Sequence, residues 1–78
     1  MHLAIVPGED CYKLFEHKTD PYGERRLLGV IAFQRGGLFD LIEAGVGWNC
    51  GLPFQQHYPS IESVWAAMAQ KGFTREVP

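Results

Sequence analysis

The sequence predicts an α+β domain: a small antiparallel β-meander of three strands, extended to four by an optional N-terminal strand, with one C-terminal α-helix packed on one face. Three observations predict it. Apolar, β-branched segments are separated by turn residues, as strands are. An Arg-Gly-Gly stretch between two of these segments is typical of a hairpin loop. Near the C-terminus, apolar residues recur at helical spacing. With 78 residues, the chain can bury one small core, so we expect residues 1–78 to form a single domain.

The first strands are short. LAIV at 3–6 is the optional fourth strand, which we expect at an edge of the sheet. CYKLFEH at 11–17 is strand-like, and KTDPYGE at 18–24 is rich in turn formers. We therefore expect a strand over 11–17 and a turn over 18–24.

The middle of the chain contains the clearest hairpin signal. RLLGVIAFQ at 26–34 is rich in β-branched and apolar residues, and Arg-Gly-Gly at 35–37 follows it directly. LFDLIEAGV at 38–46 is compatible with a returning strand or with a short helix ending at Gly45. The preceding hairpin signal and the lack of a clear N-cap favour the strand.

The connector GVGWNCGLPFQQHYPS at 45–60 leads into a helix that we predict over 61–71. Ser60 suits the N-cap, because its hydroxyl can accept a bond from a free N–H of the first turn. Gly72 suits a left-handed helix end, with Phe73 packing back on the last turn. The residues of one apolar stripe follow at helical spacing: Ile61, Val64, Trp65 and Met68.

Both faces of the predicted strands are apolar, although an antiparallel sheet with one wet face should alternate apolar and polar residues. One helix covers only one face. We therefore expect the second face to be covered by the N-terminal segment, by the 45–58 loop or by another polypeptide.

Composition narrows the function classes. The net charge of −2 disfavours a protein that coats nucleic acid, which needs many phosphate contacts. The apolar run that ends at Pro7 is too short for a signal peptide, and no run approaches the roughly 20 apolar residues of a membrane span. We expect a soluble, cytoplasmic protein with reduced cysteines.

Four residues could in principle bind zinc, namely Cys11, His17, Cys50 and His57, in C-x5-H and C-x6-H pairs. Structural zinc sites use tighter knuckles, such as C-x2-4-C or H-x3-5-H, so we expect no metal.

Catalytic and cofactor motifs are equally weak. Cys50, with His57 as base and Asp40 or Glu43 as orienting group, has no signature that defines its geometry. The glycines of GVGWNCG at 45–51 miss the dinucleotide spacing by one residue. We expect neither an enzyme nor a bound cofactor.

A nucleic-acid-binding module is the alternative function. Its basic candidates are Lys18, Arg25 and Arg26, which belong to the predicted hairpin region together with tyrosines. Acidic residues are interleaved with them, which favours an ordinary solvated surface of mixed charge.

The favoured function is a non-enzymatic protein-binding module: a small regulator or inhibitor that acts on another protein or as a homodimer. Small domains of this build are common phage and plasmid products, which is an analogy of fold alone. The helix supports the hypothesis, because its outward side carries small neutral residues where surface helices usually carry charge. We assign Trp65 to the core. The predicted interface residues are Arg35, Phe39, Trp48, Phe54, Ala67 and Gln70.

Overall fold

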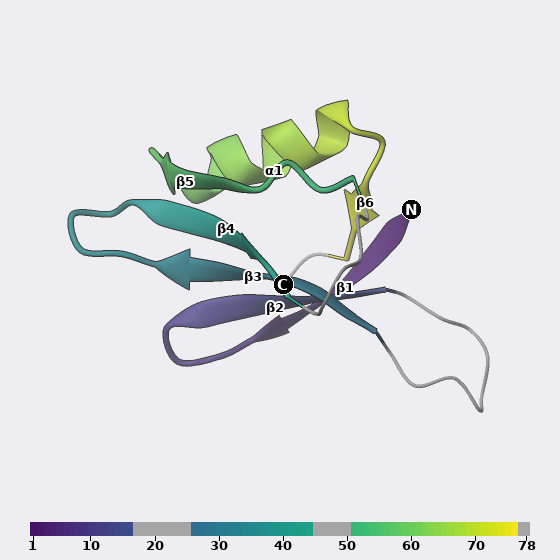
Figure 1. Ribbon diagram of the computed structural model, residues 1–78, viewed down its shortest axis with the longest axis horizontal. Coiled ribbons are helices and arrows are strands. Elements are labelled where there is room, and N and C mark those ends of the chain that lie inside the picture. The colour runs from purple at the N-terminus through teal and green to yellow at the C-terminus, as the bar shows by residue number, and fades with distance from the viewer. Residues whose placement is uncertain (17–25, 45–50, 77–78) are drawn as a thin grey trace.

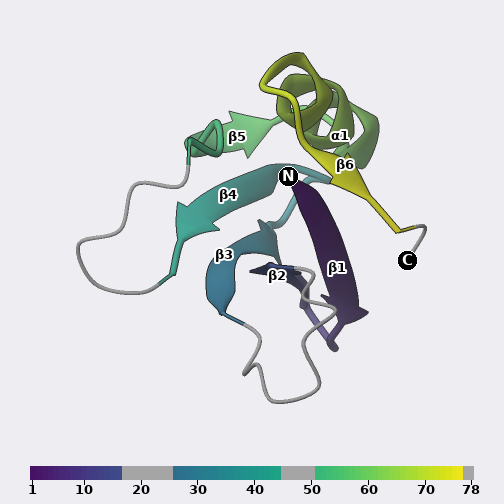
Figure 2. The ribbon, with the colours of Figure 1, turned by 90° about the vertical axis from the view of Figure 1, so that its right-hand side faces the viewer.

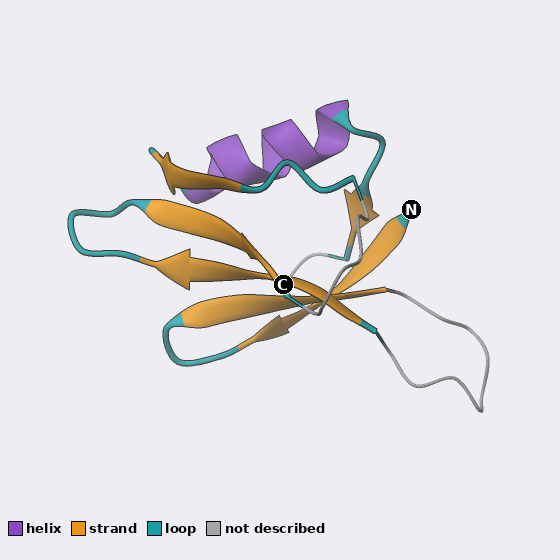
Figure 3. Cartoon of the chain, in the orientation of Figure 1, coloured by secondary structure: helices purple, strands orange, loops and turns teal. Residues whose placement is uncertain are grey.

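The computed structural model describes residues 1–16, 26–44 and 51–76, and within these residues the chain forms six strands and one helix (Figures 1 and 3). The elements in chain order are β1 (His2–Pro7), β2 (Cys11–Glu16), β3 (Leu27–Phe33), β4 (Phe39–Glu43), β5 (Gln55–Tyr58), α1 (Ile61–Gln70) and β6 (Thr74–Arg75). In these ranges, no helix is long and apolar enough to cross a membrane.

The six strands form one curled sheet in the order β5-β4-β3-β2-β1-β6. Neighbouring strands are antiparallel except β1 and β6, which pair in parallel. Helix α1 lies along the concave side and connects the two edge strands, β5 and β6 (Figure 2). The α+β class is confirmed, but the prediction of a purely antiparallel meander of three or four strands is wrong.

Three sequence interpretations change with this topology. The N-terminal strand is not at an edge, because β1 lies between β2 and β6. The connector contains β5, and the chain after the helix contains β6. Neither missed strand has the apolar pattern that predicts a strand, because β5 reads QQHY and β6 has only two residues. Strand β6 also pairs with β1, which is distant in sequence.

The predicted ends of the helix are confirmed. Ser60 has an extended backbone, and its Oγ accepts a hydrogen bond of 3.1 Å from the Ser63 N–H. At the other end, the Phe73 N–H donates to the Met68 carbonyl and the Gly72 N–H to the Ala69 carbonyl, at 3.1 and 3.0 Å. This is the Schellman pattern, and Gly72 has the positive φ, 86°, that it requires.

The predicted hairpin is confirmed as well. The segment after it forms strand β4, as predicted, and not a short helix. Gly36 and Gly37 both have positive φ, and the Gln34 N–H donates to the Leu38 carbonyl at 2.8 Å. The resulting register places Phe33 directly opposite Phe39.

The core lies between the concave face and α1. Its fully buried side chains are Leu3, Leu14, Leu28, Ile31, Val64 and Met68. Trp65 is half-buried and packs against this cluster, as expected for a residue that contributes to the core.

The two faces of the sheet are covered differently. On the concave face, Leu52 and Phe54 lie over Gly29, so the 51–54 segment folds back over the core. On the convex face, a row of paired residues crosses the sheet: Val6, Lys13, Val30 and Ile42. Val6 and Ile42 are 40% and 46% exposed. The expectation of apolar residues on both faces is therefore met, with the convex face left partly open.

Candidate functional site

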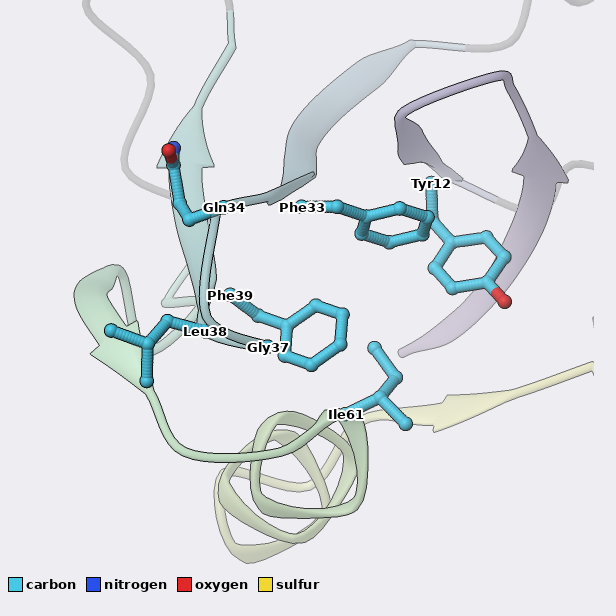
Figure 4. A pocket seen from close by; sticks show the side chains of 7 residues that line it. All are labelled: Tyr12, Phe33, Gln34, Gly37, Leu38, Phe39 and Ile61. Atoms are coloured by element: carbon cyan, nitrogen blue, oxygen red, sulfur yellow. The ribbon is translucent and has the colours of Figure 1, made fainter.

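An aromatic pocket of about 290 Å³ opens at one end of the concave face. The lining residues are Tyr12, Phe33, Gln34, Gly37, Leu38, Phe39 and Ile61. They come from β2, from the β3–β4 hairpin and from the first residue of α1. In Figure 4, the rings of Tyr12, Phe33 and Phe39 and the side chain of Ile61 point toward one another, whereas Gln34 and Leu38 point away from these rings.

The strand register assembles this ring group. Phe33 and Phe39 are a direct cross-strand pair, and their ring centroids lie 5.3 Å apart at 82°. Tyr12 pairs with Ile31, two residues before Phe33, so it lies diagonally beside Phe33 on the same face. Their centroids are 5.2 Å apart at 75°. Both contacts are edge-to-face, the favourable arrangement of aromatic pairs.

Phe33 remains 38% exposed although it contacts two other rings. Tyr12, Phe39 and Ile61 are half-buried and pack against the core cluster. The pocket is thus supported from beneath by the core and open to solvent above. A partly exposed cluster of apolar side chains gains free energy when another group covers it.

A buried carboxylate holds the hairpin in place behind the pocket. Asp40 is only 7% exposed. One of its oxygens accepts the His57 backbone N–H at 2.8 Å, and the other accepts the Gln34 side-chain amide at 3.0 Å. His57 adopts a positive φ of 63° at the irregularity between β4 and β5. Asp40 therefore links β5 to the hairpin that carries Phe33 and Phe39.

A second hollow, of about 460 Å³, lies between the later turns of α1 and strand β6. Its lining residues are Trp65, Ala66, Met68, Ala69, Phe73, Thr74 and Arg75. The guanidinium of Arg75 lies 4.0 Å from the centroid of the Trp65 ring, a cation–π contact. Tyr12 joins the two hollows, since its ring centroid is 5.9 Å from that of Trp65.

The structure brings together part of the predicted interface. Phe39 lines the aromatic pocket, and Arg35 is exposed in the hairpin turn beside it. Phe54 lies apart from them, over Gly29. Trp48 lies outside the described residues.

The two predicted helix residues differ from each other. Gln70 is exposed at the C-terminal end of α1. Ala67 is half-buried against the core cluster, so the interpretation that it points away from the core is wrong. Within α1 only Val64 and Met68 are fully buried, and Ala67 is half-buried as Ile61 and Trp65 are.

Phe39 is the one lining residue that was predicted as part of the interface, and the pocket's other two aromatic residues, Tyr12 and Phe33, were missed. The signal that identifies Phe33 was present: a hairpin loop over 35–37 makes it the neighbour of Phe39. Tyr12 could not be found in this way, because its place depends on the pairing between β2 and β3, which are separated by a long connection.

Within the described residues, the candidates for a zinc site, a catalytic site or a nucleic-acid surface do not come together in one place. Cys11 is a free, half-buried thiol, and His57 is exposed. Among residues 1–16, 26–44 and 51–76, no group of three or more His, Cys, Asp or Glu side chains could hold a metal ion. His17 and Cys50 lie outside these ranges, as do Lys18 and Arg25. Arg26 is exposed just before β3.

One tyrosine has a perturbed acidity. Tyr58 is buried opposite Phe39, and its hydroxyl donates a hydrogen bond of 2.6 Å to the Pro53 carbonyl. Burial raises the pKa of Tyr58 above its ordinary value of 10.0, because the phenolate would lose its hydration. The neutral hydroxyl thus serves as a structural donor.

Comparison of the chain with protein-family models, with curated proteins and with solved structures found no match.

Proposed function

We propose that the protein is a non-enzymatic protein-binding module, a small regulator or inhibitor, and that it binds its partner through the aromatic pocket. The observation that carries this proposal is the exposure of Phe33 at the mouth of a pocket lined by Phe39, Tyr12 and Ile61. Aromatic residues are enriched at the centres of protein interfaces, where a partner side chain fills a pocket and excludes water.

The chemistry of the lining favours binding over catalysis. The seven lining residues include no His, Cys, Asp, Glu or Lys, the residues that most often provide nucleophiles or acid–base groups. The polar side chains of the lining are Tyr12 and Gln34, and the Gln34 side chain points away from the rings and donates to Asp40 (Figure 4), so the Tyr12 phenol is the group that can orient a bound ligand by a hydrogen bond. We place this activity in the cytoplasm, where the thiol of Cys11 would stay reduced.

Site-specific crosslinking tests the proposal. Benzoylphenylalanine at position 33 keeps an aromatic side chain and places its photoreactive benzophenone at the mouth of the pocket, and the same amino acid at position 42 samples the convex face. In cells of the source organism, we expect a discrete crosslinked product from position 33 and a much weaker one from position 42. The product should disappear when Phe39→Ala is added.

The outcomes separate the possible partners. A product of twice the chain's mass identifies a second copy, and light scattering of the purified protein would then show a dimer. A crosslink to nucleic acid in place of protein, or equal products from both positions, would refute the proposal.

A further inference from the structure

A row of ring contacts links the two hollows. The aromatic row consists of Phe39, Phe33, Tyr12 and Trp65, and it ends at the guanidinium of Arg75. Neighbouring ring centroids are 5.2 to 5.9 Å apart, so no gap interrupts the row. Every ring of the row keeps some solvent exposure. A ligand that enters the aromatic pocket can therefore continue past Tyr12 to Trp65.

The far end of the row carries a positioned positive charge. The guanidinium of Arg75 is held against the face of Trp65 at 4.0 Å. It donates one long bond of 3.4 Å to the Glu76 carbonyl. A guanidinium has five N–H donors in a planar fork that matches a carboxylate, and stacking on an aromatic ring reduces the entropy lost on binding.

The dimensions suit a short stretch of extended chain. The ring of Phe33 and the guanidinium of Arg75 are at most about 15 Å apart, the span of four or five residues of an extended strand. A pocket of about 290 Å³ has room for one large apolar side chain. The site therefore has an apolar end and a cationic end at a separation that a peptide can bridge.

On the basis of the protein-binding function proposed above, we infer that the partner contributes an extended peptide segment with two determinants. One is an aromatic or large aliphatic side chain, which fills the aromatic pocket. The other is a carboxylate four or five residues away, which pairs with Arg75. The intervening residues run along Tyr12 and Trp65.

The charges around the row favour a peptide over a single-stranded nucleic acid. Glu9 and Asp10 are exposed in the β1–β2 turn, and the Asp10 carbonyl accepts the Phe33 N–H at 3.0 Å. The turn that carries these two negative charges therefore adjoins β3 at Phe33, and its charge disfavours the approach of a phosphate. The rings also contact one another edge to face, whereas base stacking requires exposed ring faces.

Selection from a random library of 12-residue peptides, displayed on phage and panned against the full chain, tests this inference. We expect enriched sequences that combine one large apolar residue with Asp or Glu four or five positions away. The best peptide, synthesised and labelled, should lose at least tenfold in affinity for the Phe33→Ala and Arg75→Gln variants. Lys13→Glu, which alters charge on the convex face, is the matched control and should bind as the wild type does.

Charge reversal provides a readout that loss of folding cannot imitate. Arg75→Glu should reject the selected peptide but bind a version in which Lys replaces the acidic residue. The inference is overturned if affinity is indifferent to Arg75→Glu or if no peptide family is enriched. Tight binding of a 15-residue oligothymidylate that depends on Arg75 would also overturn it, in favour of nucleic acid.

This experiment and the crosslinking experiment can fail independently. A protein crosslinked from position 33 without any enriched peptide keeps the protein-binding function and removes the peptide mode. If both experiments fail, both proposals fall.

Discussion

The two ends of the β3–β4 ladder differ in the size of their paired side chains. At one end Gly29 pairs with Glu43, and at the other Phe33 pairs with Phe39. Over Gly29, Leu52 and Phe54 lie directly on the sheet and close the concave face. Over Phe33 and Phe39 the face stays open, because the rings occupy the space that a covering segment would need. A single ladder thus determines both where the core is sealed and where the pocket lies.

The strongest test of this contrast compares two neighbours on β3. Ile31 is fully buried, so Ile31→Ala should destabilise the fold by about 3–4 kcal/mol through lost burial and a cavity. Phe33→Ala should cost only about 1 kcal/mol, because the ring is already partly exposed. Urea unfolding followed by circular dichroism measures both. Equal losses would show that the open end is as tightly packed as the core.

Adding a side chain at Gly29, at the closed end of the ladder, should destabilise the fold nearly as much as Ile31→Ala does. A Cβ on Gly29 would lie 3.0 Å from the Ile42 carbonyl oxygen and 3.1 Å from the Phe54 ring. We expect Gly29→Val to cost about 3 kcal/mol, because backbone atoms cannot move aside easily. The unfolding free energies of Gly29→Ala, Phe54→Ala and the double variant form the control cycle. Strict additivity would contradict the predicted contact between positions 29 and 54.

At the open end, Asp40 should be the main stabilising polar residue. Asp40→Ala leaves the His57 N–H and the Gln34 amide without their partner, for a loss of about 2 kcal/mol. The loss should be accompanied by chemical-shift changes at Phe33 and Phe39 in NMR spectra. Asp40→Asn keeps one acceptor oxygen and serves as the milder control. A stable Asp40→Ala variant with unchanged pocket resonances would show that the carboxylate does not position the hairpin.

The smallest expected effect concerns Tyr58, which pairs with Phe39 at the open end and donates to Pro53 in the covering segment. Its pKa is raised in the folded state, so the unfolded chain ionises first as the pH rises. The corresponding stability is complete below pH 10 and is lost as the pH rises through the raised pKa. We expect the wild type to lose more unfolding free energy than Tyr58→Phe does as the solution becomes alkaline. Parallel curves for the two proteins would exclude this linkage, and tyrosinate absorbance follows the ionisation directly.

Short stretches of sequence predicted those elements whose ends are defined by neighbouring residues, namely the helix and the β3–β4 hairpin. The helix was predicted almost to the residue because Ser60 and Gly72 supply its caps. The β3–β4 hairpin was predicted because Gly36 and Gly37 suit its left-handed turn. The two edge strands could not be predicted in the same way. β5 is polar in sequence, and β6 exists only because the helix end returns the chain to β1.

In the candidate site, too, some residues could be predicted from local sequence and others depend on long-range contacts. Phe39 was predicted as an interface residue of the apolar segment over 38–46, and it lines the aromatic pocket. Its partners Tyr12, Trp65 and Arg75 come from three other elements, and only the curling of the sheet brings them together. The whole row therefore depends on tertiary structure that no short stretch of the sequence encodes.

The parallel pairing of β1 with β6 has a consequence for the order of folding. It joins Leu3 to Arg75, and the neighbouring contact between the His2 ring nitrogen and the Thr74 hydroxyl spans 72 positions of the sequence. During synthesis on the ribosome, residue 2 is made long before residue 74. Until the residues of β6 have been synthesised, one edge of β1 therefore has no strand with which to pair. Contacts of such long range slow folding, and during synthesis the unpaired edge is a point where a chaperone or another nascent chain could bind first.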